Sequence, residues 1–147
     1  MRLLPEKVWF RLGDWDSADT LQAIQYLFGN YYFELNGEFH HTDCKTSGDI
    51  VTCAAIFYSD WQTTAGINGH HFNKAEFSIR DNKIECISYQ GERGANNKLL
   101  NFFVLRFADW ENKNHPDEFT NLRMTPYGPG SGKIFSARLK EFAATLQ

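Results

Sequence analysis

A run of strand-like segments separated by tight turns occupies the middle of the chain. The turn signals are Asn36-Gly37, Ser47-Gly48 and Asp81-Asn82, and the segments beside them are rich in β-branched and aromatic residues. Consecutive strands joined by tight turns form an antiparallel meander, which presents one face to a core and the other to solvent or a partner. The strands expected in this run are residues 38–45, 50–61, 70–80 and 83–90, and a shorter one is expected at 8–12.

Residues 70–80 show the alternation most clearly. One face carries Ala75, Phe77 and Ile79, with His71 and Asn73 at its end. The other face is polar and consists of Lys74, Glu76, Ser78 and Arg80. We therefore expect the first face to line a core and the second to meet solvent or another subunit.

Helical patterns flank the meander. Asp16 or Ser17 is expected to cap a first helix that ends at Gly29-Asn30. After the strands, apolar residues recur at helical spacing in two stripes. These stripes are Leu99, Phe103, Phe107 and Trp110, followed by Phe135, Leu139, Phe142 and Leu146. The sequence thus predicts one domain over residues 1–147, with a C-terminal helical extension over about 95–147.

Charge and length limit the classes of function. The 147 residues carry a net charge of −3, which argues against a broad nucleic-acid interface. The first residues lack the apolar core of a signal peptide, and no run is long enough to span a membrane, so we expect a cytoplasmic protein that does not bind membranes. Aromatic residues make up 16% of the chain, which suits a sheet-rich core or an aromatic-lined cavity.

The three cysteines are expected to be reduced thiols. If Ser47-Gly48 forms the turn, Cys44 lies opposite Val51 and is only a diagonal neighbour of Cys53. A diagonal separation of roughly 7–8 Å is poor disulfide geometry.

Two segments resemble a known superfamily. Ala75 to Ile84, which reads Ala-Glu-Phe-Ser-Ile-Arg-Asp-Asn-Lys-Ile, resembles the hairpin "Phe-x-Ile/Val-x-Asp-Gly-Lys-Ile" of nuclear-transport-factor-2-like (NTF2-like) proteins, including SnoaL-type polyketide cyclases. Gly48 to Val51 is similar to the hairpin entry common in that family. The resemblance covers roughly residues 8–92. It implies an α+β cone, in which a curved antiparallel sheet wraps around helices and leaves a pocket, and a homodimer that pairs through the outer sheet face.

The chain departs from this family at its start. Members usually begin with two helices, whereas only seven residues precede Val8 here. An uncovered apolar sheet face would be a large exposed patch. We therefore expect residues 98–146 to cover the opening of the cone; the alternative is a natural start further upstream.

Candidate catalytic residues lie near the end of the strand expected at 50–61. Superfamily enzymes commonly use a carboxylate and a tyrosine or polar partner to move a proton beside a carbonyl, and Asp60, Tyr58 and His71 are the corresponding candidates. The alternative is an exposed strand-end Asp60 beside a packed Tyr58. The residues expected to contact a ligand are Trp61, Asn73, Ser88 and Tyr89.

Two further patterns are weaker. The pairs His40-His41 and His70-His71, with Asp43 nearby, could supply metal ligands, but neighbouring strand residues point to opposite faces, so no metal is expected. Residues 128–133, Gly-Pro-Gly-Ser-Gly-Lys, look like part of a phosphate loop but lack its first glycine and its final hydroxyl residue. They are interpreted as a linker into the last helix.

The sequence therefore favours a protein that binds a small apolar molecule, without a cofactor. The alternative is a small isomerase, dehydratase or cyclase that acts by proton transfer on a carbonyl-bearing apolar substrate. A third reading is a structural dimer whose pocket is filled by its own phenylalanines.

Overall fold

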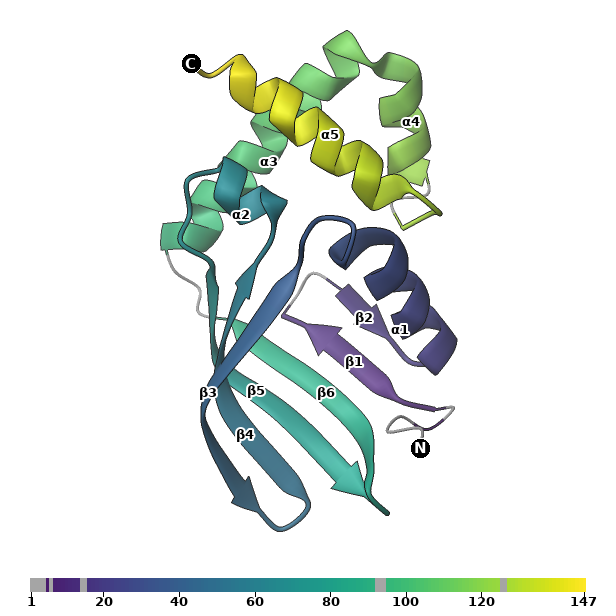
Figure 1. The fold of residues 1–147 in the computed structure, drawn as a ribbon, viewed down its shortest axis with the longest axis vertical. Coiled ribbons are helices and arrows are strands. Elements are labelled where there is room, and N and C mark those ends of the chain that lie inside the picture. Colours follow the sequence, from purple (N-terminus) through teal and green to yellow (C-terminus); the bar gives the residue numbers. More distant parts are fainter. Residues whose placement is uncertain (1–4, 6, 14–15, 92–94, 125–126) are drawn as a thin grey trace. The chain divides into compact units, whose positions relative to one another are not determined.

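The computed structural model describes residues 5, 7–13, 16–91, 95–124 and 127–147 (Figure 1). The chain divides into two compact units. The sheet unit comprises Met1–Gln25, Phe39–Phe57 and His71–Glu92, and the helical unit comprises Tyr26–Glu38, Tyr58–His70 and Arg93–Gln147. Within the described residues, no helix is both long enough and apolar enough to cross a membrane.

One curved, six-stranded sheet dominates the sheet unit (Figure 1). Its order is β2-β1-β6-β5-β4-β3, so the four long strands lie side by side in sequence order, as the turn signals predict. The strands are β1 (Trp9–Leu12), β2 (Asp16–Ala18), β3 (Glu38–Ser47), β4 (Ile50–Tyr58), β5 (His70–Arg80) and β6 (Lys83–Gly91). The sheet is mixed, not wholly antiparallel as expected, because β1 pairs in parallel with β6, with Phe10 opposite Ile87.

Strand β5 contains a bulge that changes which residues share a face. Phe72 lies opposite Gly91 and Lys74 lies opposite Gln90, so Asn73 is the extra residue. Phe72 therefore joins Ala75 on the apolar face, and His71 and Asn73 are exposed. The expectation that His71 and Asn73 end the apolar face is wrong, because strict alternation does not survive a bulge.

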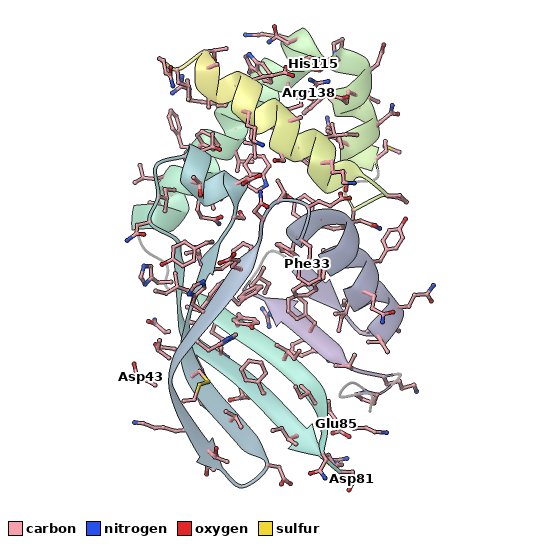
Figure 2. The ribbon with its side chains drawn as sticks, in the orientation of Figure 1. Phe33, Asp43, Asp81, Glu85, His115 and Arg138 are labelled. Carbon is pink, nitrogen blue, oxygen red and sulfur yellow. A yellow bond between two sulfur atoms is a disulfide. The ribbon has the colours of Figure 1, made fainter. Side chains whose placement is uncertain are left out.

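The β3–β4 hairpin corrects the expectation of reduced thiols. Its two turn residues are Gly48 and Asp49, one position later than expected. Ser47 then faces Ile50, which brings Cys44 opposite Cys53, with their Cα atoms 4.1 Å apart. The two cysteines form a disulfide, drawn as a yellow bond in Figure 2. Cys86 is the free thiol among the described residues.

Two helix starts also differ from the sequence prediction. Helix α1 (Leu21–Leu27) follows Thr20, whose hydroxyl oxygen accepts from the Ala23 amide at 3.1 Å, and residues 16–18 form β2 instead. Strand β4 ends at Tyr58, and helix α2 (Asp60–Thr64) replaces the rest of the expected strand. Ser59 caps α2 by accepting from the Trp61 amide at 3.3 Å. The pattern Ser-x-x-Gln at 59–62 is a capping-box signal, and it marks this helix in the sequence.

The helical unit packs around an aromatic core. It contains α2, the π-helix η1 (Phe28–Tyr32), α3 (Ala95–Asn114), α4 (Pro116–Met124) and α5 (Ser131–Ala144). Residues from both predicted helical stripes are buried in its core, which consists of Leu35, Phe107, Leu139 and Phe142. Trp61 packs against this core, with its ring centroid 5.1 Å from that of Phe107.

The start of α5 approaches η1 closely. A Cβ added at Gly132 would lie 2.7 Å from the Tyr31 carbonyl oxygen and 2.6 Å from the Glu34 Cβ, so only glycine fits there. The Ser131 hydroxyl donates to the Asn30 carbonyl at 3.1 Å, and the Lys133 amide donates to the Glu34 carboxylate at 3.2 Å. The Gly-Ser-Gly-Lys segment therefore serves packing, and a carboxylate occupies the place that an anion would take at this helix start.

Candidate functional site

The apolar face of the sheet is lined by aromatic rings around Tyr89. The Tyr89 ring centroid lies 4.6 Å from that of Phe39, 5.3 Å from Phe72 and 6.3 Å from Phe77. Phe10 is 6.2 Å away, on β1. We call this set of rings, together with Phe57 and His41, the aromatic face.

These contacts require strong curvature of the sheet. Tyr89 is on β6 and Phe39 is on β3, with β5 and β4 between them. In a flat sheet, strands three positions apart are separated by roughly 14 Å. The intervening strands carry the small buried residues Ala75 and Ala55 on this face, which leaves room for the rings to meet above them. The sequence thus has small residues on the two intervening strands, β4 and β5, and aromatic residues on the strands that flank them, β3 and β6, whose rings meet.

A tyrosine–histidine pair lies within the aromatic face. The Tyr89 hydroxyl and the Nε2 atom of His41 are 2.9 Å apart, which is a hydrogen bond. Burial raises the pKa of Tyr89 above its ordinary value, so the phenol stays protonated. Burial, and then the neighbouring His40, lower the pKa of His41. At neutral pH the pair therefore consists of two neutral groups, one able to donate and the other to accept.

The pair connects the inside of the unit with solvent. Tyr89 is 4% exposed, whereas the imidazole of His41 belongs to an exposed residue on β3. In the tautomer whose Nε2–H donates to the Tyr89 oxygen, the single phenol proton remains for the acceptor atom of a small molecule on the aromatic face, and the imidazole behind it can exchange its own proton with water. Sequence reasoning named Tyr89 but missed His41 as its partner. The available signal was that Phe39 and His41 share a face of β3. No local pattern in the sequence, however, predicts that side chains of β3 reach those of β6.

The predicted acid, Asp60, has a different environment. It is the first residue of α2, where the Asn36 side-chain amide donates to its two oxygens at 3.1 and 3.2 Å. The Ser136 hydroxyl also donates to Oδ2 at 2.5 Å. The Asp60 backbone amide donates to the Leu35 carbonyl at 2.9 Å. These bonds tie α2 to α5 and to the segment after η1, which is a structural arrangement.

The other predicted site residues are dispersed. Tyr58 ends β4 and is half-buried, and it belongs with Asp60 to the helical unit, whereas His71 belongs to the sheet unit. Trp61 lies in the helical core, where its indole N–H donates to the Tyr31 hydroxyl at 3.0 Å. Ser88 is buried, on the opposite face of β6 from Tyr89. Of the predicted ligand contacts, Tyr89 is therefore the one on the aromatic face.

A second group of polar side chains lies in the helical unit, where α3, α4 and α5 meet. Arg138 donates to Glu118 and, at 2.5 Å, to Glu141, and His115 Nε2 lies 3.1 Å from Glu141 (Figure 2). Glu111 is fully buried beside them, and Arg138 Nε lies 3.9 Å from its Oε1 atom. Neither Glu111 oxygen has a hydrogen-bond partner among the described residues.

Burial raises the pKa of Glu111 to about 7. The negative charge of Glu118 raises it further, and the charges of His115 and Arg138 oppose the rise. Sequence reasoning did not single this residue out, although Glu111 follows Phe107 by one helical turn and so falls on the buried stripe. Among the described residues, no three His, Cys, Asp or Glu side chains are grouped so that they could hold a metal ion.

Comparison with known proteins gives the fold. No protein-family model matches the sequence, and no curated protein matches it. Similar solved structures include an LEH-like epoxide hydrolase from M. tuberculosis, with a TM-score of 0.51, 11% identity, and coverage of 70% of this chain and 75% of that one. A protein assigned as a polyketide cyclase from Sinorhizobium meliloti has a TM-score of 0.50 and 11% identity over 59% of this chain and 74% of that one.

A third similar structure is TerC co-crystallized with polyporic acid, with a TM-score of 0.50 and 10% identity over 67% of this chain and 81% of that one. The chain therefore has an α+β, NTF2-like fold, as its hairpin motifs predict. At these identities the likeness establishes the fold alone.

Proposed function

We propose that the aromatic face binds a small apolar molecule that carries a carbonyl or similar acceptor group. The observation that carries this proposal is the 2.9 Å hydrogen bond between Tyr89 and His41, which belong to that face. Apolar ligand sites are lined by hydrophobic and aromatic side chains with a few placed polar groups that fix orientation. Here the rings supply the apolar lining, and the protonated Tyr89 hydroxyl supplies the oriented donor.

The similar structures support a ligand of this class. TerC was co-crystallized with polyporic acid. The other two neighbours carry the names of enzymes that act on small organic molecules. These proteins share the fold with this chain, and the proposal takes from them the kind of ligand that such a fold accommodates.

A second candidate function is proton transfer on the bound molecule. It is favoured by the exposed position of His41 behind the buried Tyr89, because such a pair can pass a proton between a substrate oxygen and water. This is the isomerase, dehydratase or cyclase alternative, with His41 and Tyr89 as the reacting pair. In it, Asp60 holds α2 in place.

A matched pair of probes tests the binding proposal. Indanone and indane have nearly the same apolar shape, but only indanone has a carbonyl oxygen. A ligand that binds the native state raises the melting temperature. We expect indanone to raise it more than indane, and Tyr89→Phe to remove the difference between the two probes. Tyr26→Phe is the control, because it removes an exposed hydroxyl elsewhere in the chain.

Two results would contradict the proposal. One is an absence of any shift across a wider panel of ketones, steroids, aromatic polyketides and fatty acids, which would favour a face filled by the protein's own rings. The other is an indanone shift that is unchanged in Tyr89→Phe, which would place the ligand elsewhere.

A further inference from the structure

Helix α3 presents a stripe of apolar side chains to solvent, and two of them, Phe102 and Leu105, lie on the side of the helix away from Phe107 and the helical core. Leu99, Phe102 and Leu105 are spaced three residues apart and are 58%, 62% and 66% exposed. Large apolar side chains that share one face of a helix usually cover a partner, whereas single exposed ones are common. The stripe is bordered by the exposed charged residues Lys98 and Asp109.

The spacing along the stripe is that of a helix-pairing seam. Lys98, Phe102, Leu105 and Asp109 follow one another at intervals of four, three and four residues. This is the heptad spacing that keeps side chains on one side of a helix facing a second helix. A basic residue begins the seam, two apolar residues form its middle and an acidic residue ends it.

This order of charges selects the partner and its direction. If two copies of α3 pair in opposite directions about a two-fold axis between residues 103 and 104, Phe102 of each copy meets Leu105 of the other. Lys98 then meets Asp109 at both ends of the contact. A parallel pairing would instead place Lys98 against Lys98 and Asp109 against Asp109, which is unfavourable. A two-fold interface requires this kind of self-complementary surface.

We propose that α3 is the site of self-association, and that it pairs antiparallel with α3 of a second copy through Lys98, Leu99, Phe102, Leu105 and Asp109. This contact differs from the outer sheet face, which was the dimer surface expected from the sequence. On that face, Lys74 and Glu76 pair with each other on β5. One helix pair buries less than the roughly 800 Å² per partner of a standard interface, so the dimer exchanges with monomer.

Sedimentation of the full chain over about a hundredfold range of concentration tests the proposal. We expect the unmodified protein to pass from monomer to dimer as concentration rises. Leu105→Gln removes an apolar contact from both ends of the symmetric seam, and we expect it to raise the dissociation constant at least about tenfold. Because Leu105 is exposed, the fold is expected to persist, and circular dichroism checks this.

Charge exchange tests the antiparallel register. Lys98→Asp and Asp109→Lys each place like charges together and are expected to weaken the dimer, whereas the double variant restores opposite charges and is expected to recover it. Lys140→Asp on α5 is the charge-matched control and is expected to have no effect.

Three outcomes would overturn the proposal. They are a monomer at every concentration, a dimer that Leu105→Gln leaves intact, and a double charge variant that associates no better than either single variant. The second outcome would direct attention to the outer face of the sheet.

Discussion

Tyr89 in the sheet unit and Glu111 in the helical unit are both titratable side chains held away from water, but their hydrogen bonding differs. Tyr89 in the sheet unit and Glu111 in the helical unit are 4% and 0% exposed, and burial raises the pKa of both. The Tyr89 hydroxyl has His41 as a hydrogen-bond partner, whereas neither Glu111 oxygen has one among the described residues. A buried polar group that has a hydrogen-bond partner lowers the stability of the fold little. One that has no such partner lowers it by the free energy of removing the group from water.

The difference shows where pH can act on each unit. Tyr89 stays neutral throughout the physiological range, so its pairing with His41 is a lasting feature of the aromatic face. Glu111 has a pKa of about 7, so its buried carboxyl changes charge at neutral pH. The sheet unit thus holds a stable polar group, and the helical unit holds a pH-sensitive one.

The largest expected effect comes from Glu111→Gln. The folded-state pKa of Glu111 is about 7 and its ordinary value is 4.5, so the folded chain binds more protons than the unfolded chain between these values. Its ionisation therefore lowers the free energy of unfolding as pH rises from about 4.5 through 7. Glutamine stays neutral, and we expect it to stabilise the protein by up to roughly 3 kcal/mol above pH 8, with little effect near pH 4.5.

Urea unfolding at several pH values measures this difference. The control is Asp117→Asn, which neutralises an exposed carboxylate on α4 in the same unit. The groups around Glu111 that also titrate or carry charge are His115, Glu118, Arg138 and Glu141, and all of them remain in the variant. A stability difference that does not depend on pH would mean that Glu111 is not the group that titrates.

The next effect belongs to the sheet unit, where the disulfide holds the β3–β4 hairpin. Cys44 and Cys53 are 9 positions apart in the chain, and their disulfide closes the loop between them. Because reduction frees this loop in the unfolded chain, we expect it to lower the free energy of unfolding by roughly 2–3 kcal/mol. Urea unfolding with and without a reductant measures the loss, and Cys86→Ser, which removes the free thiol, is expected to leave that loss unchanged. Thiol titration of the unfolded, unreduced chain is expected to find one thiol, and three would refute the disulfide.

Much of the fold could be predicted from local sequence signals. The turn signals and alternation gave the order of β3 to β6, and the two helical stripes gave α3 and α5, because both depend on residues a few positions apart. Two of the errors came from single-residue shifts. A turn one position later paired Cys44 with Cys53, and one extra residue at Asn73 moved His71 off the apolar face.

The candidate site was harder to predict, because it depends on curvature. Nothing in the local pattern brings His41 on β3 to Tyr89 on β6, since the contact forms only when the sheet curls over Ala55 and Ala75. The environment of Asp60 was missed for a related reason. Its partners Asn36 and Ser136 are 24 and 76 residues away in the chain, so no local pattern predicts them.

Asp60→Ala sharpens the contrast with Glu111, because Asp60 is a carboxylate that has its partners. The substitution leaves the Ser136 hydroxyl, which is 8% exposed, without its acceptor, and also removes the contact with Asn36. We expect a loss of roughly 1–3 kcal/mol in the free energy of unfolding, measured by urea unfolding. Asp117→Ala is the control. If the variant kept its stability but lost a proton-transfer activity of the unmodified protein, Asp60 would be the proton-transfer group, as the sequence predicts.

The smallest expected effect on stability is that of Tyr89→Phe. It removes the hydroxyl but keeps the ring, and His41 is exposed, so water can replace the lost hydrogen bond at a cost of about 1 kcal/mol or less. The pKa of His41 is the more informative quantity. Burial is the main cause of its lowering and His40 the second, so we expect His41 to titrate below 6.5 with or without the Tyr89 hydroxyl.

Histidine ring signals in NMR, followed against pH, separate these causes. His40→Gln is expected to raise the pKa of His41, because it removes the neighbouring positive charge, whereas Tyr89→Phe is expected to leave it lowered. A return of the His41 pKa to 6.5 in Tyr89→Phe would mean that the hydrogen bond, and not burial, sets the charge of the imidazole. In that case a ligand that displaces the Tyr89 hydroxyl would also change the protonation of His41, and the sheet unit would share the pH sensitivity of the helical unit.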